Sequence, residues 1–235
     1  MRASRWSSPP STPAEAAAAR IFPPTVPIPA GRLEREPPIL VGPFLLGRTP
    51  VTNREFAAFL AAGRAAAPPW WRDPRFSGDR RPVVGVSWHD AVAFCDWLSE
   101  ADPGESAVGG RWRLPTDAEW EFAMRGGLSA ASPRTPWGDE VPPGEIPEGP
   151  LDGPWETAHG TPNGFGLLDP GTMVHEWCLN GSADAPVAGP ARRASKGGSW
   201  RHAIRWSAPS ASSSLPPDFR YSDYGFRVLR ELSAA

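Results

Sequence analysis

The second half of the chain most constrains the fold, because it contains no helical pattern. More than 100 residues follow Gly127, and they are rich in Gly, Pro and Trp with only brief apolar runs between them. This composition predicts short strands joined by long packed loops. Loops of that length inside one domain are usually functional. Tryptophans can hold such loops in place, because an indole buries a large apolar area while its N–H donates to a carbonyl.

Three helices are predicted before Gly127, each with a capping signal in which a side-chain oxygen accepts from the first turn. The caps are Thr52 or Asn53, then Ser87 with Asp90, then Thr116 with Glu119. The helices run through REFAAFLAAG, AVAFCDWLSEA and EWEFAM, and the last one ends at Gly126 and Gly127. The apolar stripes are Phe56, Phe59 and Leu60 in the first helix, and Val92, Cys95 and Leu98 in the second.

The strands expected in the first half are short. IPAGRL and ILVGPFLLG each read as one strand, and VLREL near the C-terminus reads as a terminal strand. Residues 1–24 are rich in Ser, Pro and Ala and are expected to form a loosely held leader. Residues 25–235 then form one α+β domain with about three helices and short antiparallel strands, long enough to bury a core.

Charge and hydropathy exclude several classes of partner. The net charge is -2, from 24 basic and 26 acidic residues, so no global field attracts nucleic acid or an acidic membrane. No apolar run reaches the roughly 18 residues that span a bilayer, and the N-terminal segment lacks the apolar core of a secretory signal. We therefore expect a cytoplasmic protein whose partner is another protein or a small molecule.

The two cysteines, Cys95 and Cys178, are too few for a disulfide framework. Each lies in an apolar stretch beside an aromatic residue. Buried, unreactive thiols are the expected outcome.

Six segments in order resemble the formylglycine-generating-enzyme (sulfatase-modifying factor) domain family. They are RPVVGVSWHDAVAFCDWLS, RWRLPTDAEWEFAMRGG, TPWGDE, PNGFGLLDPGTMVHEWC, KGGSW and YGFRVLR. The match covers about Ile28 to Arg230, and six motifs in order are far more specific than one. The resemblance implies an elaborated C-type-lectin fold, in which the C-terminal segment builds the active or ligand-binding face.

The chemistry of the family enzymes is not expected here. Those enzymes carry two cysteines, with four residues between them, just after the GGS motif, and the pair binds copper as thiolates. In GGSWRHAIRWSA, His202 and Ser207 take these positions, and hydroxyl or imidazole alone replaces thiolate poorly. Related ergothioneine-forming enzymes take iron from a separate histidine-rich domain. No two of the four histidines of this chain are paired at metal-ligand spacing on a helix, so we expect no catalysis, with His202 as the only near-neutral titrating group of the face.

The segment from Trp200 to Tyr224 is therefore predicted to bind a ligand. It combines aromatic residues, arginines and many serines, as adaptable binding surfaces do. The candidate contacts are Arg201, His202, Ile204, Trp206, Ser207, Phe219, Tyr221, Ser222, Asp223 and Tyr224. An ordinary strand–loop–strand with polar residues facing water is the alternative.

The same segment, between GGSW and GFR, resembles the variable region of proteins diversified by retroelements. In that resemblance Phe219, Tyr221, Ser222 and Asp223 vary, with further candidates after Trp200, while the surrounding Pro, Arg and Gly residues form the scaffold. Surface substitutions on a fixed backbone usually cost little stability. The same ending also occurs in ordinary members of the family, so this resemblance is a hypothesis about the chain.

The resemblance also implies a calcium site around LLDPGTMVHEW. By position, its ligands are the carboxylates of Asp169 and Glu176 and the carbonyls of Thr172 and Val174, a set of oxygens that suits a hard cation. However, the usual Gly-Asn-Val-Trp core is here Thr172 to His175. The alternative is that Asp169 caps the loop and Glu176 pairs with an arginine.

Three functional hypotheses follow. The first is a non-catalytic binding module acting through residues 201–224. The second is an enzyme of the oxidase or modifying-factor kind that uses His202, Ser207 or Asp223 without cysteines. The third is an inactive structural partner of another enzyme.

Overall fold

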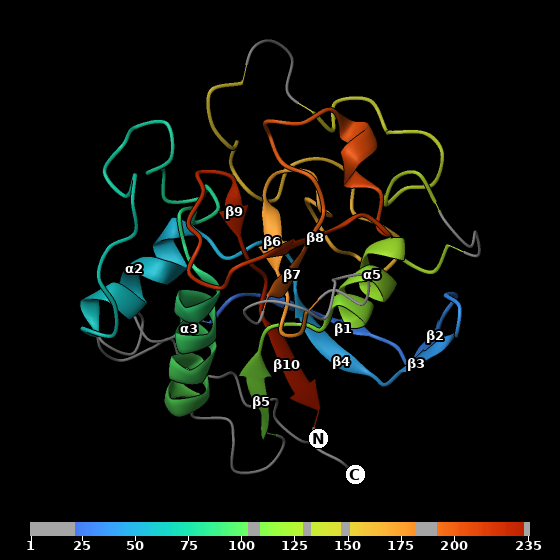
Figure 1. Cartoon of the computed structure of the whole chain (residues 1–235), viewed down its shortest axis with the longest axis horizontal. Helices are drawn as coiled ribbons and strands as arrows, with labels where there is room; N and C mark the ends of the chain where they lie inside the picture. The colour runs from blue at the N-terminus through green and yellow to red at the C-terminus, as the bar shows by residue number, and fades with distance from the viewer. Residues whose placement is uncertain (1–21, 103–108, 129–132, 147–150, 182–191, 233–235) are drawn as a thin grey trace, which may run out of the picture.

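The computed structural model describes residues 22–102, 109–128, 133–146, 151–181 and 192–232 (Figure 1). The helices are α2 (Asn53–Ala61), α3 (Trp88–Ala101) and α5 (Asp117–Arg125), with one 3₁₀ turn, η1 (Ile204–Ser207). The strands of the first half are β1 (Thr25–Ile28), β2 (Gly31–Leu33), β3 (Ile39–Val41), β4 (Phe44–Gly47) and β5 (Gly109–Arg113). Those of the second half are β6 (His175–Trp177), β7 (Arg193–Lys196), β8 (Ser212–Leu215), β9 (Tyr224–Gly225) and β10 (Leu229–Leu232). The α+β class is confirmed.

The first sheet joins the two ends of the chain. Its strand order is β1-β4-β10-β5, and all neighbours are antiparallel. The predicted terminal strand is β10, which lies between β4 and β5 and so ties the C-terminus to the first strands of the domain (Figure 1).

The three helices begin where their capping signals predict. Each has a complete capping box, headed by Thr52, Ser87 and Thr116. Thr52 is the N-cap of α2. The side-chain amide of Asn53 does not cap the helix but donates to the carbonyls of Phe76 (2.6 Å) and Gly78 (2.9 Å). The third helix ends at Gly126, whose left-handed φ of 57° suits glycine.

The expectation of two strands between residues 28 and 47 is wrong, because each run breaks at a proline. The first run splits into β1 and β2 around Pro29, and the second into β3 and β4 around Pro43. Proline lacks the N–H that a ladder needs. As a result, β1 pairs with β4 in the main sheet while β2 pairs with β3 in a separate arm.

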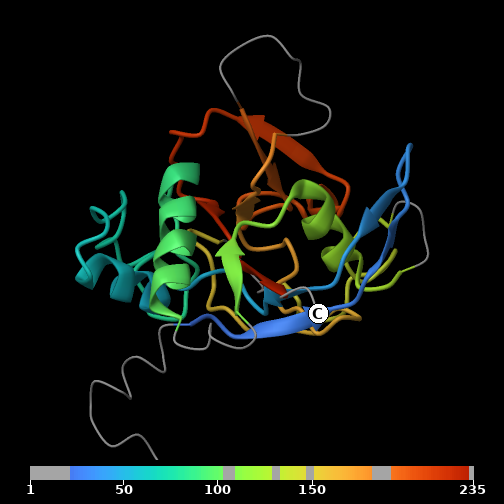
Figure 2. The same ribbon diagram turned by 90° about the horizontal axis from the view of Figure 1, so that it is seen from below.

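Two apolar clusters fill the interior. One packs Phe56 and Phe59 of α2 and Phe94 of α3 against Phe226, and the other packs α5 against β1, β4 and β10 through residues such as Trp120 and Leu46. Figure 2 shows α2 and α3 on one side of the molecule and α5 on the other. Cys95 belongs to the first cluster and Cys178 to the second, and both are free and buried as expected.

The second half has the loop-rich form that its composition predicts. No α-helix follows Arg125 within the described ranges, and strands β8-β7-β6-β9 form a second four-stranded sheet. Indole N–H groups hold the loops by donating to backbone carbonyls, from Trp88 to Cys178, Trp177 to Val86, Trp137 to Thr161 and Trp200 to Ser222.

The expected leader lies mostly outside the described residues, which begin at Phe22. The Phe22 ring stacks on Trp112 at 6.0 Å, and the Pro24 carbonyl accepts from the Arg48 amide at 2.7 Å. Residues 22–24 are therefore packed on the domain. None of the helices in the described ranges is both long and apolar enough for a membrane crossing.

Candidate functional site

Strands β6 and β9 place the C-terminal segment against the centre of the second sheet. They pair in parallel, with His175 opposite Tyr224, and the His175 amide donates to the Asp223 carbonyl at 2.9 Å. This pairing joins residues 49 positions apart in the chain, so residues around Asp223 lie beside the start of β6.

A pocket of about 200 Å³ opens at the start of the predicted binding segment. Its polar lining comes from Thr172, Ser199, His202 and Ser207, and its apolar lining from Ile146, Leu151, Trp155, Trp200, Ala203 and Ile204. The Trp155 indole nitrogen is buried and makes no hydrogen bond to the described residues. An apolar cavity with a few convergent polar groups is the usual form of a ligand site.

Behind the pocket, two histidines and an aspartate form one hydrogen-bonded cluster. His175 Nε2 lies 3.2 Å from His202 Nδ1, which lies 3.1 Å from the Ser199 hydroxyl. That hydroxyl donates to Asp223 Oδ2 at 3.0 Å. On its other side, His175 Nδ1 lies 2.7 Å from the Gly197 carbonyl, so Nδ1 carries the proton and Nε2 presents its lone pair. Burial lowers the pKa of His175 below its ordinary value, so the ring is neutral at pH 7.

A row of ring contacts continues from this cluster to the surface. Centroid distances are 5.1 Å from His202 to His175, 4.8 Å from His175 to Tyr224, 5.4 Å from Tyr224 to Tyr221, and 5.7 Å from Tyr221 to Phe219. Contacts of this length are favourable aromatic pairs. The row connects the pocket to the exposed end of the segment.

The predicted contact residues divide by burial. Arg201, His202, Trp206, Phe219 and Tyr221 are exposed, and Ile204 and Ser222 are half-buried. In contrast, Ser207, Asp223 and Tyr224 are buried, Tyr224 within the aromatic core. These three side chains support the face from beneath.

The expectation for this face counted His202 alone among the histidines, whereas β6 brings the His175 imidazole within 3.2 Å of it. Spacing on a single helix could not reveal this pair, which comes from a strand and a distant loop. A signal was present in the sequence: His175 stands where the family motif has tryptophan, inside the segment that departs from the usual pattern.

No thiol reaches the pocket. Burial raises the pKa of Cys95, and burial also raises the pKa of Cys178 well above the ordinary value of a thiol. At the positions where the family resemblance places the copper-binding pair, His202 lines the pocket and Ser207 is buried beside it. Neither of the two cysteines of the chain lines the pocket, so it offers no thiolate.

Two of the four residues predicted to hold calcium, Asp169 and Glu176, contact a guanidinium instead. The buried Glu176 carboxylate accepts from Trp120 Nε1 at 2.7 Å and from Arg227 Nε at 3.0 Å. Arg227 also donates to the carbonyls of Leu168 (2.8 Å) and Asp169 (2.6 Å), while the Asp169 carboxylate accepts the amides of Ala158 and His159. A calcium ion at Glu176 and Asp169 must displace these donors, so the two residues do not fit calcium as they stand. The contacts match the alternative, in which Asp169 caps the loop and Glu176 pairs with an arginine.

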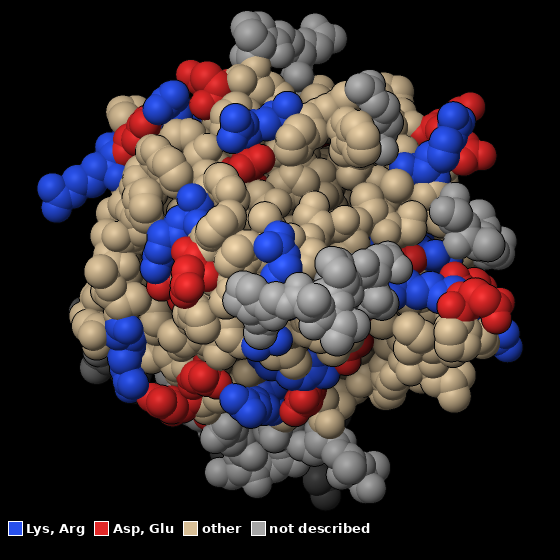
Figure 3. All heavy atoms as spheres, in the orientation of Figure 1, with Lys and Arg blue, Asp and Glu red and all other residues tan. Residues whose placement is uncertain are grey.

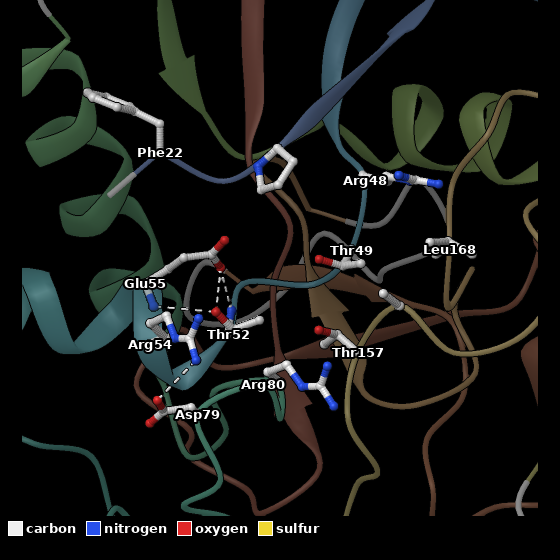
Figure 4. A pocket seen from close by; sticks show the side chains of 12 residues that line it. Phe22, Arg48, Thr49, Thr52, Arg54, Glu55, Asp79, Arg80, Thr157 and Leu168 are labelled. Atoms are coloured by element: carbon white, nitrogen blue, oxygen red, sulfur yellow. Dashed lines mark hydrogen bonds and ion pairs between the residues drawn. The ribbon is translucent and has the colours of Figure 1, made fainter. Parts of the chain in front are cut away.

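A larger cavity of about 650 Å³ lies elsewhere, lined by residues from Phe22 to Leu168 and by none of the C-terminal segment. Figure 4 shows two interactions among its lining residues: Arg54 pairs with Asp79 at 3.3 Å, and Thr52 donates to Glu55 in the helix cap. We assign the functional site to the smaller pocket because the histidine cluster adjoins it.

Charge does not mark a binding face. On the side seen in Figure 3, basic and acidic side chains are interspersed and separated by wide uncharged areas. This agrees with the small net charge of -2.

Comparisons with known proteins agree with this architecture. Residues 13–232 match the model of the sulfatase-modifying factor enzyme 1-like domain. The formylglycine-generating enzyme of Streptomyces coelicolor is 32% identical over 80% of this chain and 78% of its own length. The inactive C-alpha-formylglycine-generating enzyme 2 of Mus musculus is 34% identical over 56% of this chain and 43% of its own length.

Among solved structures, the Treponema denticola variable protein 1 superimposes with a TM-score of 0.70 at 24% identity, over 88% of this chain and 94% of that one. This similarity confirms the C-type-lectin-like fold. The relatives include both a generating enzyme and a protein named inactive. Family membership therefore does not indicate whether this chain is active, and that question depends on the residues of its site. The chain belongs to the sulfatase-modifying factor enzyme 1-like domain family.

Proposed function

We propose that the chain is a non-catalytic binding protein whose ligand inserts an apolar group into the pocket at Ile204 and covers the exposed aromatics of the C-terminal segment. The observation that carries the proposal is the ring row from His202 to Phe219, in which the buried His175 and Tyr224 link the pocket by packing to the exposed aromatics. Only a group about the size of an amino-acid side chain fits a pocket of about 200 Å³.

The exposure pattern supports a binding surface. Among the described residues, six large apolar side chains are markedly exposed, and Trp206 (57%), Phe219 (40%) and Tyr221 (39%) are three of them. Their concentration in one segment differs from the scattered exposure that needs no explanation. Rigid aromatic side chains lose little conformational entropy on binding.

The backbone beneath these side chains is well anchored. The Trp88 amide donates to the Pro217 carbonyl at 3.0 Å, and the Gly85 amide donates to the Tyr221 carbonyl at 2.9 Å. Arg220 donates to the Gly85 carbonyl at 3.1 Å and to Asp90 at 3.0 Å. This scaffold supports the retroelement hypothesis at the exposed positions, whereas buried Asp223 is held by Ser199 and is not free to vary. A reverse transcriptase and an adenine-rich copy of the 3′ coding end beside the gene are the genomic test.

Selection from a phage-displayed peptide library on the purified chain tests the binding proposal. We expect enriched peptides that share an apolar residue and that lose at least about tenfold in affinity against Ile204→Arg, which fills the pocket, and against Trp206→Ala. The matched control is Leu40→Ala on the β3 arm, where the leucine is 84% exposed and distant in sequence. No enrichment, or equal binding to all variants, contradicts the proposal.

One observation favours a second candidate, an enzyme of the family with non-cysteine chemistry. The His175–His202 pair lies beside the polar groups of the pocket and provides two neighbouring imidazoles that sequence spacing did not reveal. Purified protein with stoichiometric copper or iron supports this candidate, and elemental analysis that finds neither removes its commonest reactions.

A further inference from the structure

Three elements converge at the back of the pocket to bring two imidazoles and a carboxylate together. His175 comes from β6, His202 from the loop after Trp200, and Asp223 from the residue before β9. One ligand atom from each lies within 4.8 Å of the other two. In the described parts of the chain, no other set of three His, Cys, Asp or Glu side chains is grouped in this way.

His175 is oriented as a metal-binding histidine usually is. Its Nδ1–H donates to the Gly197 carbonyl at 2.7 Å, which fixes the tautomer and directs the Nε2 lone pair toward the cluster. Metal-ligating histidines commonly donate their other ring N–H to a backbone carbonyl in this manner. The Tyr224 ring, 4.8 Å away, packs on the imidazole and limits its rotation.

The other two ligands are positioned by one serine. The Ser199 hydroxyl lies 3.1 Å from His202 Nδ1 and 3.0 Å from Asp223 Oδ2, so it holds both side chains toward His175. Asp223 is nearly fully buried, and a buried carboxylate needs a cation or several donors. Its cationic neighbour is Arg201, at 3.8 Å on the exposed side.

The donor set and its spacing fit a transition metal. Two imidazoles and one carboxylate form a known ligand set for zinc and non-haem iron. Ligand nitrogens at about 2.0–2.1 Å from a tetrahedral zinc lie roughly 3.3 Å apart, and the two imidazole nitrogens are 3.2 Å apart. We propose that His175, His202 and Asp223 bind one divalent transition-metal ion, with a coordination position open toward the pocket.

The open position follows from counting ligands. Three protein ligands leave a tetrahedral ion one site short, which is the arrangement of metals that also contact a ligand or water. Because His202 and Ser199 line the pocket, the vacant position faces the space where the bound group is proposed to insert. The metal proposal does not depend on the peptide-binding proposal, since it concerns the three side chains alone.

Titration of the metal-free full chain with ZnCl₂ by calorimetry, and with Co²⁺ by visible absorption, tests the proposal. The wild type is expected to bind one equivalent of Zn²⁺, and Co²⁺ is expected to give a d–d spectrum of nitrogen and oxygen ligands. His202→Ala and Asp223→Asn are each expected to weaken Zn²⁺ binding by at least about tenfold. His89→Ala is the matched control, because His89 is exposed and pairs with Asp218 away from the cluster.

Two results overturn the proposal: a wild type that does not bind one equivalent of Zn²⁺ in the millimolar range or below, or equal affinity of wild type and His202→Ala. Each variant is checked for an unchanged melting temperature. If Asp223→Asn does not fold, the Zn²⁺ affinity of His202→Ala decides the test, because His202 is exposed and its substitution leaves the core intact. A chain that binds selected peptides but no Zn²⁺ contradicts the metal site and leaves the binding function standing.

Discussion

His175 Nε2 lies 3.2 Å from His202 Nδ1, although 27 residues separate the two histidines in the chain. The contact exists because β6 pairs with β7, and the loop after β7 lies beside the residues before β6, where Gly198 donates to Gly171 and Trp200 donates to Met173. It places two imidazoles at the pocket that, in the resemblance to the family enzymes, corresponds to the position of a cysteine pair. The site of this chain is therefore built from imidazole, carboxylate and aromatic rings.

The ring row predicts a division between buried and exposed positions. Tyr224→Ala is expected to lower the free energy of unfolding by about 3 kcal/mol, because it empties a buried site in the aromatic core. Phe219→Ala and Tyr221→Ala are expected to cost less than about 1 kcal/mol each, since both rings are partly exposed. Urea unfolding checks all three. If Tyr221→Ala loses as much free energy of unfolding as Tyr224→Ala, the outer part of the segment belongs to the core, and this contradicts the binding surface.

The buried pair of Arg227 and Glu176 predicts a large effect on stability. Arg227→Met removes the guanidinium and leaves the Glu176 carboxylate buried without its cation, which costs about 3–5 kcal/mol in comparable pairs. Arg80→Met is the control, because the Arg80–Glu156 pair is exposed and such pairs contribute less than about 1 kcal/mol. Similar urea midpoints for the two variants are inconsistent with a structural role for Arg227.

The same pair predicts the response to calcium. Glu176 already accepts from Arg227, so a divalent ion at this position meets a like charge. We expect 5 mM CaCl₂, compared with EDTA, to leave the melting temperature unchanged. A saturable rise that Asp169→Asn abolishes establishes the calcium site implied by the family resemblance.

How much the sequence predicts depends on how local each signal is. Capping boxes at Ser87 and Thr116 involve residues three apart, and these helices begin where predicted. The apolar runs around Pro29 and Pro43 locate the strands, but each run supplies two strands with different partners, and the pattern of apolar residues does not report which strand pairs with which. The His175–His202 contact depends on the loop after β7, whose Trp200 amide donates to the Met173 carbonyl just before β6, and no periodicity reports it.

The burial of Asp169 predicts a pH dependence of stability. Burial raises its pKa to about 6 from 3.8, so folding favours the protonated form. The resulting stabilisation is present below about pH 4 and is lost as the pH rises through 6, by up to about 3 kcal/mol. Asp169→Asn removes this loss, and asparagine tolerates the positive φ of 50° at this position.

The comparison for Asp169 uses urea unfolding at pH 4, 5, 6 and 7 in EDTA. The free energy of unfolding of Asp169→Asn, relative to wild type, is expected to increase across this range. Asp218→Asn, at an exposed side chain, serves as the control and is expected to show no such trend. A difference between wild type and Asp169→Asn that stays constant with pH contradicts the assignment.

The central claim is that the pocket at Ser199 and Ile204, continued by the ring row to Phe219, is the ligand site. Amide chemical-shift mapping of the ¹⁵N-labelled chain, titrated with the tightest peptide from the selection, tests it most directly. The largest shifts are expected at residues 199–207 and 219–224. Shifts centred instead on the larger cavity between Phe22 and Leu168 contradict the claim.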